Sequence, residues 1–494
     1  MSVPAHRILS VNDAPIRPDG HYVLYWMTAY RRTRHNFALQ RAVELAVELG
    51  RPVLVLEALR AGYQYASDRL HRFVIDGMVD NARACRAHGV AYHPYLEPRH
   101  GDAKTLLRDF AKRACAVVTD DFPVFFLPRM VAAAGDALQL RLETVDGNGL
   151  LPIRATRKVF ARAVDFRRYI QKTSKPHLSA ISEPEPLAHE SLPKGLEVPS
   201  SLAKRWPAVP ASLLAGEDDL SGFQIDHGVP VAGMRGGAVA ARERWDAFLD
   251  HRLDRYGEGR NDPDDEVSSG LSAYLHWGHI STHELFVDVT RRESWTPDAT
   301  GEKATAKREG WWGLSSGAES FFDELITWRE LGFNMGALRD DYAEYDSLPG
   351  WARRTLSEHA DDPRPHVYEL DQFESAETHD ELWNAAQRQL LRDGRIHNYL
   401  RMLWGKKILE WSPTPRDALA VMLELNNKYG LDGRDPNSYS GILWVLGRYD
   451  RAWGPERPIF GKVRYMTSDS TRKKVKLKRY LQEYGPSQGQ TELF

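Results

Sequence analysis

The sequence predicts two domains, a doubly wound parallel-sheet α/β domain followed by an all-α domain. The first part of the chain alternates continuous apolar runs with helical patterns, which is typical of a parallel sheet covered on both faces. From about residue 238 onward, helical periodicity dominates and no convincing strand occurs. Prolines interrupt the region between them. We therefore expect a sheet domain at 15–150, a helix and interdomain linker at 151–237, a helical domain at 238–484 and a flexible C-terminus at 485–494.

Five apolar runs in the first domain are expected to be strands, most of them of buried type. They lie at 23–27, 52–59, 90–96, 116–122 and 138–145. The helices expected between them lie at 36–49, 68–88, 104–114 and 127–134. No GxGxxG follows the first strand, so a dinucleotide-binding site of the Rossmann type is not supported. A ligand of such a sheet is expected at the carboxyl ends of its strands.

Composition and charge exclude several classes of protein. The formal net charge of −2 argues against a uniformly basic nucleic-acid-binding surface. Basic side chains still gather between 461 and 480, which indicates either a solvated helix face or a phosphate-contacting patch. The chain shows no run of about 18 apolar residues and no signal-peptide core. Its two cysteines argue against a disulfide framework and favour a reducing, cytoplasmic location, and we separately expect a monomer.

The stretch 378–466 is rich in tryptophan beside charged and amide side chains. Trp404 and Trp411 are seven residues apart and share a face of one predicted helix. Asn398 and Arg401 are three apart and therefore adjacent on that helix. A single tryptophan of this kind is most often a core residue. So many tryptophans beside charged and amide side chains are more than the packing of a hydrophobic core requires.

Two other motifs have more than one interpretation. The segment 268–272, SSGLS, precedes a helix and is either an ordinary N-cap or a phosphate-binding helix N-terminus. His276, His279 and His283 in HWGHISTHE share one helical face, as metal ligands do. Because neither an HExxH motif nor a cysteine partner accompanies them, we expect no metal site.

Taken together, these segments resemble the photolyase/cryptochrome family. The sequence motifs WNAAQ, HNYLRM, DGRDPN and FGKVRYM are most similar to those of class II cyclobutane pyrimidine dimer photolyases. The resemblance is close over the C-terminal half and looser over the N-terminal half, where YWMTAYRRTRHNFAL departs from the family wording after YWM. It implies noncovalently bound FAD, active when reduced, in the helical domain. Whether the sheet domain holds a second, antenna chromophore, and which one, stays open.

The resemblance also implies roles for individual residues. The implied catalytic residues are Glu324, Asn426, Trp328, Trp444 and Met402. The implied electron-transfer series runs from Trp404 through Trp383 to Trp411, with Tyr368 as an extension. The residues implied to bind the cofactor are Tyr256, Ser268, Ser269, Leu271, Ser272, Asn398, Arg401, Asn426, Asp432 and Asp435. The residues implied to contact DNA are Trp328, Trp444, Arg448, Arg451, Arg457, Lys462 and Arg464, of which Arg464 enters the gap left by a flipped dimer.

Within this assignment, Glu324 hydrogen-bonds a flipped-out pyrimidine, and Trp328 and Trp444 are opposite walls of its pocket. Arg401 is expected to pair with Asp432 near the flavin. Where relatives often carry an acid after Asn426, this chain has Asn427, and the effect of that difference stays open.

The implied function is light-driven repair of cyclobutane pyrimidine dimers in UV-damaged DNA, the reaction of a deoxyribodipyrimidine photolyase. In that reaction, excited reduced FAD donates an electron to the flipped-out dimer. The alternatives are a cryptochrome-like flavin photoreceptor without repair activity, a photolyase for a different photolesion, and a nonspecific DNA-binding protein without flavin. The joint presence of Glu324, Trp328 and Trp444 favours the enzyme, because a photoreceptor is free to lose them.

Overall fold

The computed structural model describes residues 2–486, and the chain forms two compact units. Unit 1 consists of Met1–Arg157, Thr173–Asp246 and Gly270–Asp298, and unit 2 of Lys158–Lys172, Ala247–Ser269 and Ala299–Phe494. The units interleave along the chain, so 270–298, which the sequence groups with the helical domain, belongs to the unit that contains the sheet. Of the tail expected to be flexible, 487–494 lies outside the described residues.

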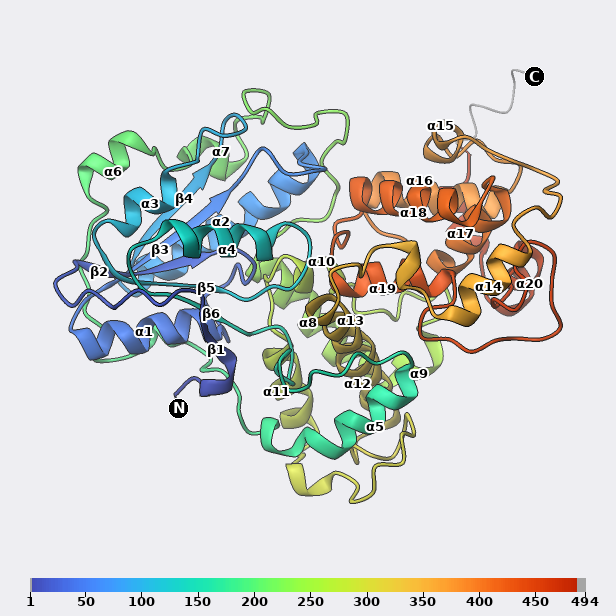
Figure 1. Ribbon diagram of the computed structural model, residues 1–494, viewed down its shortest axis with the longest axis horizontal. Helices are drawn as coiled ribbons and strands as arrows, with labels where there is room; N and C mark the ends of the chain where they lie inside the picture. The colour runs from blue at the N-terminus through green and yellow to red at the C-terminus, as the bar shows by residue number, and fades with distance from the viewer. Residues whose placement is uncertain (1, 487–494) are drawn as a thin grey trace. The chain divides into compact units, whose positions relative to one another are not determined.

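Unit 1 is built on a six-stranded sheet in the order β1-β6-β5-β2-β3-β4 (Figure 1). The strands are β1 (Ile8–Ser10), β2 (Tyr22–Met27), β3 (Val53–Leu59), β4 (Ala91–Leu96), β5 (Ala114–Asp120) and β6 (Leu142–Val145). β1 pairs antiparallel with β6, whereas the other neighbours are parallel. The predicted parallel α/β fold is confirmed. The sequence did not predict β1, because its three residues are partly exposed and carry no buried apolar run.

Helices cover both faces of this sheet. They are α1 (Phe37–Leu49), α2 (Asp68–Ala87), α3 (Leu106–Ala111) and α4 (Leu127–Ala137). Leu106 and Phe110 of α3 pack with Leu24 of β2 on one face. Val74 of α2 packs with Leu59 of β3, whose side chain points to the other face because strand residues alternate. The sheet is therefore doubly wound, as predicted.

The proline-rich segment after helix α5 (Ala163–Thr173) also packs onto unit 1. Its elements are η2 (Lys175–His177), η3 (Pro186–Ala188), α6 (Ser200–Arg205) and α7 (Ala211–Ala215). Leu202 and Trp206 join the cluster around α3, and Leu213 joins the cluster around α2. Unit 1 further contains α10 (Ser272–His276), α11 (Thr282–Arg292) and the short turn η1 (Ala5–Arg7), whereas the short turn η5 (Pro297–Ala299) spans the division in the chain. Helix α8 (Ala238–His251) runs across the division between the units.

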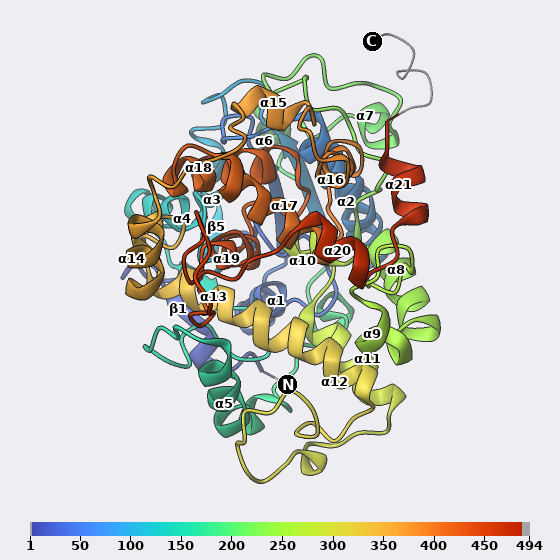
Figure 2. The same cartoon turned by 90° about the vertical axis from the view of Figure 1, so that its right-hand side faces the viewer.

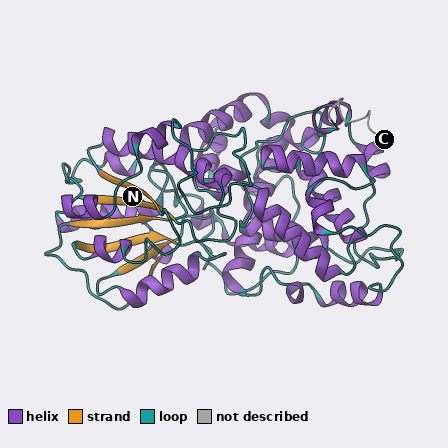
Figure 3. Ribbon diagram, turned by 90° about the horizontal axis from the view of Figure 1, so that it is seen from above, coloured by secondary structure: helices purple, strands orange, loops and turns teal. Residues whose placement is uncertain are grey.

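Unit 2 is helical, with no β-strand in its described part (Figure 3). Its elements are α5 (Ala163–Thr173), η4 (Leu253–Arg255), α9 (Tyr256–Gly259), α12 (Ser316–Phe322), η6 (Asp323–Trp328), α13 (Arg329–Leu338), η7 (Tyr345–Ser347), α14 (Gly350–Glu358), α15 (Leu370–Glu374), α16 (Glu381–Asp393), α17 (Asn398–Trp411), α18 (Pro415–Tyr429), α19 (Pro436–Val445), α20 (Ser468–Lys474) and α21 (Lys478–Tyr484). Among the described residues of the whole chain, no helix combines the length and the apolar character that crossing a membrane requires.

One long helix of unit 2 is made of three consecutive pieces, α12, η6 and α13 (Figure 2). The middle piece, η6, is π-helical, with a wider turn that changes the direction in which later side chains point. Glu324 and Trp328 both lie in this turn. Such wide turns occur often at functional sites.

Helix α13 approaches the backbone at the start of α19 closely at Gly332. A Cβ atom added to Gly332 would lie 2.9 Å from the carbonyl oxygen of Pro436 and 3.0 Å from Cα of Asn437. These are backbone atoms, so they cannot turn aside as a side chain does. Because α13 continues directly from Trp328 and α19 carries Trp444, this contact helps to set the distance between the two indoles.

We predict that Gly332→Ala lowers the free energy of unfolding by about 1–3 kcal/mol, because the added methyl forces two backbones apart. Gly257→Ala in α9 is the control, since its Cβ would lie 3.6 Å from Cβ of Ser320, an ordinary contact. Urea unfolding followed by far-UV circular dichroism measures both. Equal stability of the two variants would contradict the close α13–α19 contact.

Candidate functional site

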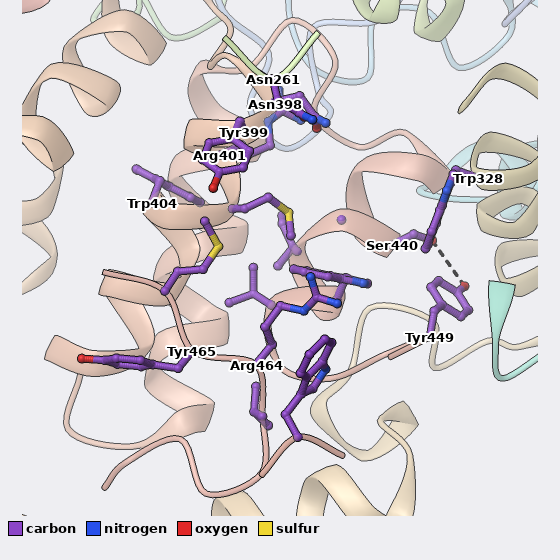
Figure 4. A pocket seen from close by; sticks show the side chains of 18 of the residues that line it. Asn261, Trp328, Asn398, Tyr399, Arg401, Trp404, Ser440, Tyr449, Arg464 and Tyr465 are labelled. Atoms are coloured by element: carbon purple, nitrogen blue, oxygen red, sulfur yellow. Dashed lines mark hydrogen bonds between the residues drawn. The ribbon is translucent and has the colours of Figure 1, made fainter. Parts of the chain in front are cut away.

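Unit 2 contains a cavity of about 700 Å³, a size typical of ligand sites (Figure 4). Its walls come from α17, α19, the π-helical turn η6 and the loop after α19. It brings together residues that the sequence singled out from distant segments. They are Glu324, Trp328, Asn398, Arg401, Met402, Trp404, Trp444, Arg457 and Arg464.

The first turns of α17 form one wall, where Asn398 and Arg401 lie close together (Figure 4). The expected pair is present: one terminal nitrogen of Arg401 lies 3.0 Å from each carboxylate oxygen of Asp432. The Nε atom of Arg401 is buried and has no hydrogen-bond partner among the described residues. Buried donors are normally satisfied, so this atom is one that a bound ligand can complete.

Glu324 and Trp328 contribute from the π-helical turn. The Glu324 carboxylate forms an ion pair with Arg260, which also lines the cavity. Burial raises the pKa of Glu324, and the Arg260 guanidinium opposes that rise. Tyr256 lies against the same guanidinium, with the Arg260 Cζ atom 5.7 Å from its ring centroid. Tyr256 is buried and is not itself among the residues that line the cavity.

Trp444 is flanked by two cations. The Cζ atom of Arg464 lies 5.2 Å from the Trp444 ring centroid, and Nζ of Lys406 lies 5.3 Å from it. Arg464 also stacks on Trp453, at 4.2 Å, and its Nε lies 3.2 Å from the Asp450 carboxylate. Cations over an indole face are attracted to it, so both contacts hold the ring in place.

Several residues from the predicted cofactor set lie outside the cavity lining. Asn426 is buried, and its amide nitrogen donates to Oγ of Ser438 at 2.8 Å. Asp435 caps the N-terminus of α19 by accepting from the backbone nitrogen of Asn437 at 2.8 Å.

The serine-rich segment does not cap a helix with its hydroxyls. Helix α10 begins at Ser272 with Leu271 as its N-cap, and no side chain bonds to that turn. Ser268 and Ser269 end a segment of unit 2, whereas Leu271 and Ser272 belong to unit 1. The interpretation of 268–272 as an ordinary N-cap is therefore not supported by the hydrogen bonds.

The residues predicted to contact DNA differ in exposure. Arg451, Arg457 and Lys462 are exposed in the loop after α19, and Arg457 lines the cavity. Arg448 is buried and donates to the hydroxyl of Ser347. Burial lowers the pKa of Arg448 to about 10. Its guanidinium is thus directed into the interior of the unit.

The three tryptophans predicted to transfer electrons lie next to one another in unit 2. Trp404 lines the cavity, and its carbonyl oxygen accepts from Nε1 of Trp383 at 3.0 Å. The ring centroids of Trp383 and Trp411 are 5.9 Å apart, and those of Trp411 and Tyr368 are 5.6 Å apart. All three indoles are buried, whereas Tyr368 is half-buried. Three neighbouring buried indoles and a half-buried tyrosine therefore lead from the cavity towards the surface of unit 2.

Sequence reasoning missed Arg260 and Lys406. Nothing in the linear pattern links Arg260 to Glu324, which lies sixty-four positions later. Lys406 sits in a helix beside a second lysine, which resembles a solvated face, but the structure buries it completely. Its ammonium donates to the carbonyl oxygen of Val445 at the end of α19. Burial lowers the pKa of Lys406 to about 7, with Arg464 adding to the effect and Asp450 opposing it.

In unit 1, the carboxyl ends of β2 and β5 meet where the strand order reverses, the place where such sheets bind ligands. There the Asp120 carboxylate accepts from the backbone nitrogens of Thr28, Ala29 and Tyr30, at 2.7–2.9 Å. Protein groups therefore fill this position.

Two histidines of HWGHISTHE, His279 and His283, are buried and bond to backbone groups of unit 1. Burial lowers the pKa of His279 to about 3 and that of His283 well below its usual value. Nδ1 of His279 accepts from the backbone nitrogen of Gly237, and Nε2 of His283 contacts the carbonyl oxygen of Gly149. Within the described residues, no group of histidine, cysteine or acidic side chains is arranged to hold a metal ion.

Known proteins resemble this chain along nearly its whole length. A deoxyribodipyrimidine photo-lyase of Methanothermobacter thermautotrophicus is 34% identical over 97% of this chain and 98% of its own length. One of Arabidopsis thaliana is 32% identical over 93% of this chain and 88% of its own. No protein-family model matches the chain.

Solved structures share the fold at low identity. A class III photolyase from Agrobacterium tumefaciens has a TM-score of 0.65 at 17% identity, covering 94% of this chain and 86% of that one. A cryptochrome from Synechocystis has a TM-score of 0.64 at 15% identity, covering 94% and 88%. An archaeal photolyase from Sulfolobus tokodaii, described with two FAD molecules, has a TM-score of 0.63 at 14% identity, covering 94% and 89%.

The buried Lys406 predicts a pH-dependent stability. Its pKa of about 7 in the folded chain is below the 10.5 of an exposed lysine, so between these values the unfolded chain holds a proton that the folded chain has lost. The free energy of unfolding should therefore rise with pH over this window, by about 1 kcal/mol per pH unit from this group. Lys406→Met should remove that contribution. Urea unfolding of both proteins from pH 7 to pH 10 tests it, and parallel stability curves would contradict it.

Proposed function

This chain belongs to the photolyase/cryptochrome family, and we propose that it is a class II photolyase that repairs cyclobutane pyrimidine dimers in UV-damaged DNA. One observation carries the proposal. A single cavity holds a carboxyl group, Glu324, and two indoles, Trp328 and Trp444, beside the α17 residues expected near a flavin. This set suits two covalently joined pyrimidines of one strand, with apolar and hydrogen-bonding groups, lifted out of the duplex.

The proposal requires FAD, and the residues present fit it. The unpartnered Nε of Arg401 and the exposed amide of Asn398 offer donors on one wall of the cavity. Donors of this kind stabilise an electron-rich flavin ring. When bound, FAD supplies light absorption and one-electron donation. The further residues of unit 2 that we propose to hold it are Tyr256, Ser268, Ser269, Asn426, Asp432 and Asp435.

The residues of the cavity bind and orient the lesion. Trp328 and Trp444 provide aromatic walls, each worth about 1–3 kcal/mol of stacking. Met402 adds a polarizable thioether that adapts to an irregular shape. Glu324 lines the cavity and offers a hydrogen bond to a pyrimidine. When the lesion binds, the Glu324 carboxyl group gives up its ion pair with Arg260 and bonds to the lesion instead.

DNA binding is assigned to the loop after α19. Arg451, Arg457 and Lys462 are exposed there and can neutralise phosphates. Arg464 lies against Trp444 and Trp453, where a cation and aromatic rings together can replace a lost base stack. We propose that Arg464 occupies the gap left by the flipped dimer.

The reaction breaks the carbon–carbon bonds that join the two pyrimidines and has no net change in redox state, so the protein is proposed to be a carbon–carbon lyase. Its part is positioning and electrostatics. The decisive experiment illuminates FAD-loaded, reduced protein with UV-irradiated oligothymidylate and follows the absorbance of the restored thymines. Light-dependent recovery supports the proposal. Bound flavin without recovery would favour a photoreceptor or a different photolesion, and failure to bind FAD would contradict all three.

We predict that Glu324→Gln lowers the yield of dimer repair by about tenfold or more, because the amide cannot supply the same proton and charge to the lesion. The bound flavin, read from its absorbance, should be unchanged. Binding of dimer-containing DNA, read by fluorescence anisotropy, should change less than repair does.

Glu302→Gln is the matched control, because Glu302 is exposed and does not line the cavity. Its repair yield should equal that of the unmodified chain. Full repair by Glu324→Gln would remove Glu324 from the mechanism and leave Trp328 and Trp444 as the residues that define the pocket.

A further inference from the structure

The outer end of the tryptophan series is a cluster of a tyrosine and two histidines. Tyr368 meets Trp411 edge-on, at 5.6 Å between ring centroids. The Tyr368 hydroxyl lies 2.6 Å from Nδ1 of His379, whose ring is 5.0 Å from that of Trp411. His366 stacks on His379 at 3.8 Å. The cluster thus places a phenol, an imidazole and a buried indole in mutual contact.

Backbone hydrogen bonds fix this arrangement. The backbone nitrogen of His379 donates to the Tyr368 hydroxyl oxygen at 3.0 Å. The backbone nitrogen of Tyr368 donates to the carbonyl oxygen of Trp411 at 3.2 Å. Since the phenolic oxygen already accepts one hydrogen bond, its own proton is free to point at Nδ1 of His379, and 2.6 Å is a short, strong contact for such a donor.

We propose that Tyr368 and His379 form a proton-coupled electron donor for Trp411. Tyr368 gives one electron to the Trp411 radical cation, which becomes a neutral indole. In the same step, the O–H bond of Tyr368 breaks, its proton forms a bond to Nδ1 of His379, and a neutral tyrosyl radical remains. The inference rests on the proposed function, which supplies oxidised Trp411 through light-excited oxidised flavin and the series from Trp404. A soluble thiol then reduces the tyrosyl radical.

The surroundings keep His379 ready to accept a proton. Partial burial is the largest effect that lowers the pKa of His379, and the charge of the neighbouring His366 is the second. Of the charged groups that face it, Lys407 lowers the pKa further, whereas Asp380 and Glu410 raise it. The net shift is downward, so the imidazole is neutral at pH 7 and Nδ1 holds a free lone pair. His379 is also exposed, so the proton it takes up can pass to solvent.

The position of Tyr368 and His379 explains why Trp411 needs them as an electron donor. Trp411 is 1% exposed, so a soluble reductant cannot touch its ring. Tyr368 and His379 lie between that ring and solvent. A phenol that loses its electron without its proton becomes a strongly acidic cation, which makes plain electron loss unfavourable. A base within hydrogen-bond reach removes this barrier, as in general base catalysis.

The test uses FAD-loaded protein in the oxidised state, excited by a laser flash, with tryptophan and tyrosyl radicals followed by transient absorption and electron paramagnetic resonance. The variant His379→Gln keeps a hydrogen-bond acceptor beside Tyr368 but no group that takes up a proton. We expect its tyrosyl radical yield to fall by about tenfold or more, with a longer-lived tryptophan radical. His366→Gln is the matched control and should stay within about twofold, because His366 has no hydrogen bond to Tyr368.

Two further readouts separate proton transfer from a structural role. Formation of the tyrosyl radical should slow in D₂O. Its yield should hold from alkaline pH through neutrality and fall only below the ordinary histidine pKa of about 6.5, where His379 becomes protonated. Equal tyrosyl yields in His379→Gln and the unmodified chain, or no effect of D₂O, would overturn the proposal.

A measurement without flavin completes the test. In the apoprotein at pH 8, nitrogen-15 NMR of His379 should show the proton on Nε2 and an accepted hydrogen bond at Nδ1 that Tyr368→Phe abolishes. A proton on Nδ1 would overturn the inference whatever the flavin does. If instead the flash produces no tryptophan radical while the NMR result holds, the proposed electron series fails, and with it the oxidant on which this step depends.

Discussion

The burial of helix α17 on almost every side is the constraint on which the functional part of unit 2 depends. Gly405 lets α17 approach α18 and α19, since a Cβ there would lie 2.6 Å from a Val445 methyl and 3.1 Å from Met422 Sδ. Because most of the helix is buried, most of its side chains contact neighbouring parts of unit 2. Its first turns face the cavity, Trp404 contacts both cavity and Trp383, and Trp411 ends beside Tyr368. Helix α17 therefore runs from the cavity to the cluster of Tyr368 and His379.

This burial also explains why charged groups occur inside the unit. Taking Lys406 out of water costs free energy unless it gains partners, and it has the Val445 carbonyl and the Trp444 ring. Arg464 also lies over the Trp444 ring and pairs with Asp450. Stability alone would favour apolar residues at such places. Their presence is understandable if a tryptophan exposed to a ligand must keep one orientation when the cavity is entered.

Much of this architecture was predictable, for reasons that lie in particular residues. Five strands of unit 1, β2 to β6, coincide with mainly apolar runs, so their positions in the sequence are plain within a few residues. β1 was missed because its three residues are partly exposed. At the site, a family resemblance pointed to Glu324, Trp328 and Trp444. Arg260 and Lys406 were not foreseen, because a long-range ion pair and a lysine buried under an indole leave no periodic signal.

The two ends of the aromatic series need opposite environments, and unit 2 provides both. At the cavity, burial raises the pKa of Glu324 and lowers that of Lys406, so a charge that forms there is felt strongly by its neighbours. At the far end, His379 is exposed beside the half-buried Tyr368, where water can carry protons away. An electron vacancy that moves outward therefore goes from a place where charge is costly to one where a proton can leave. That gradient makes the outward direction favourable, and the buried indoles between the ends keep the path intact.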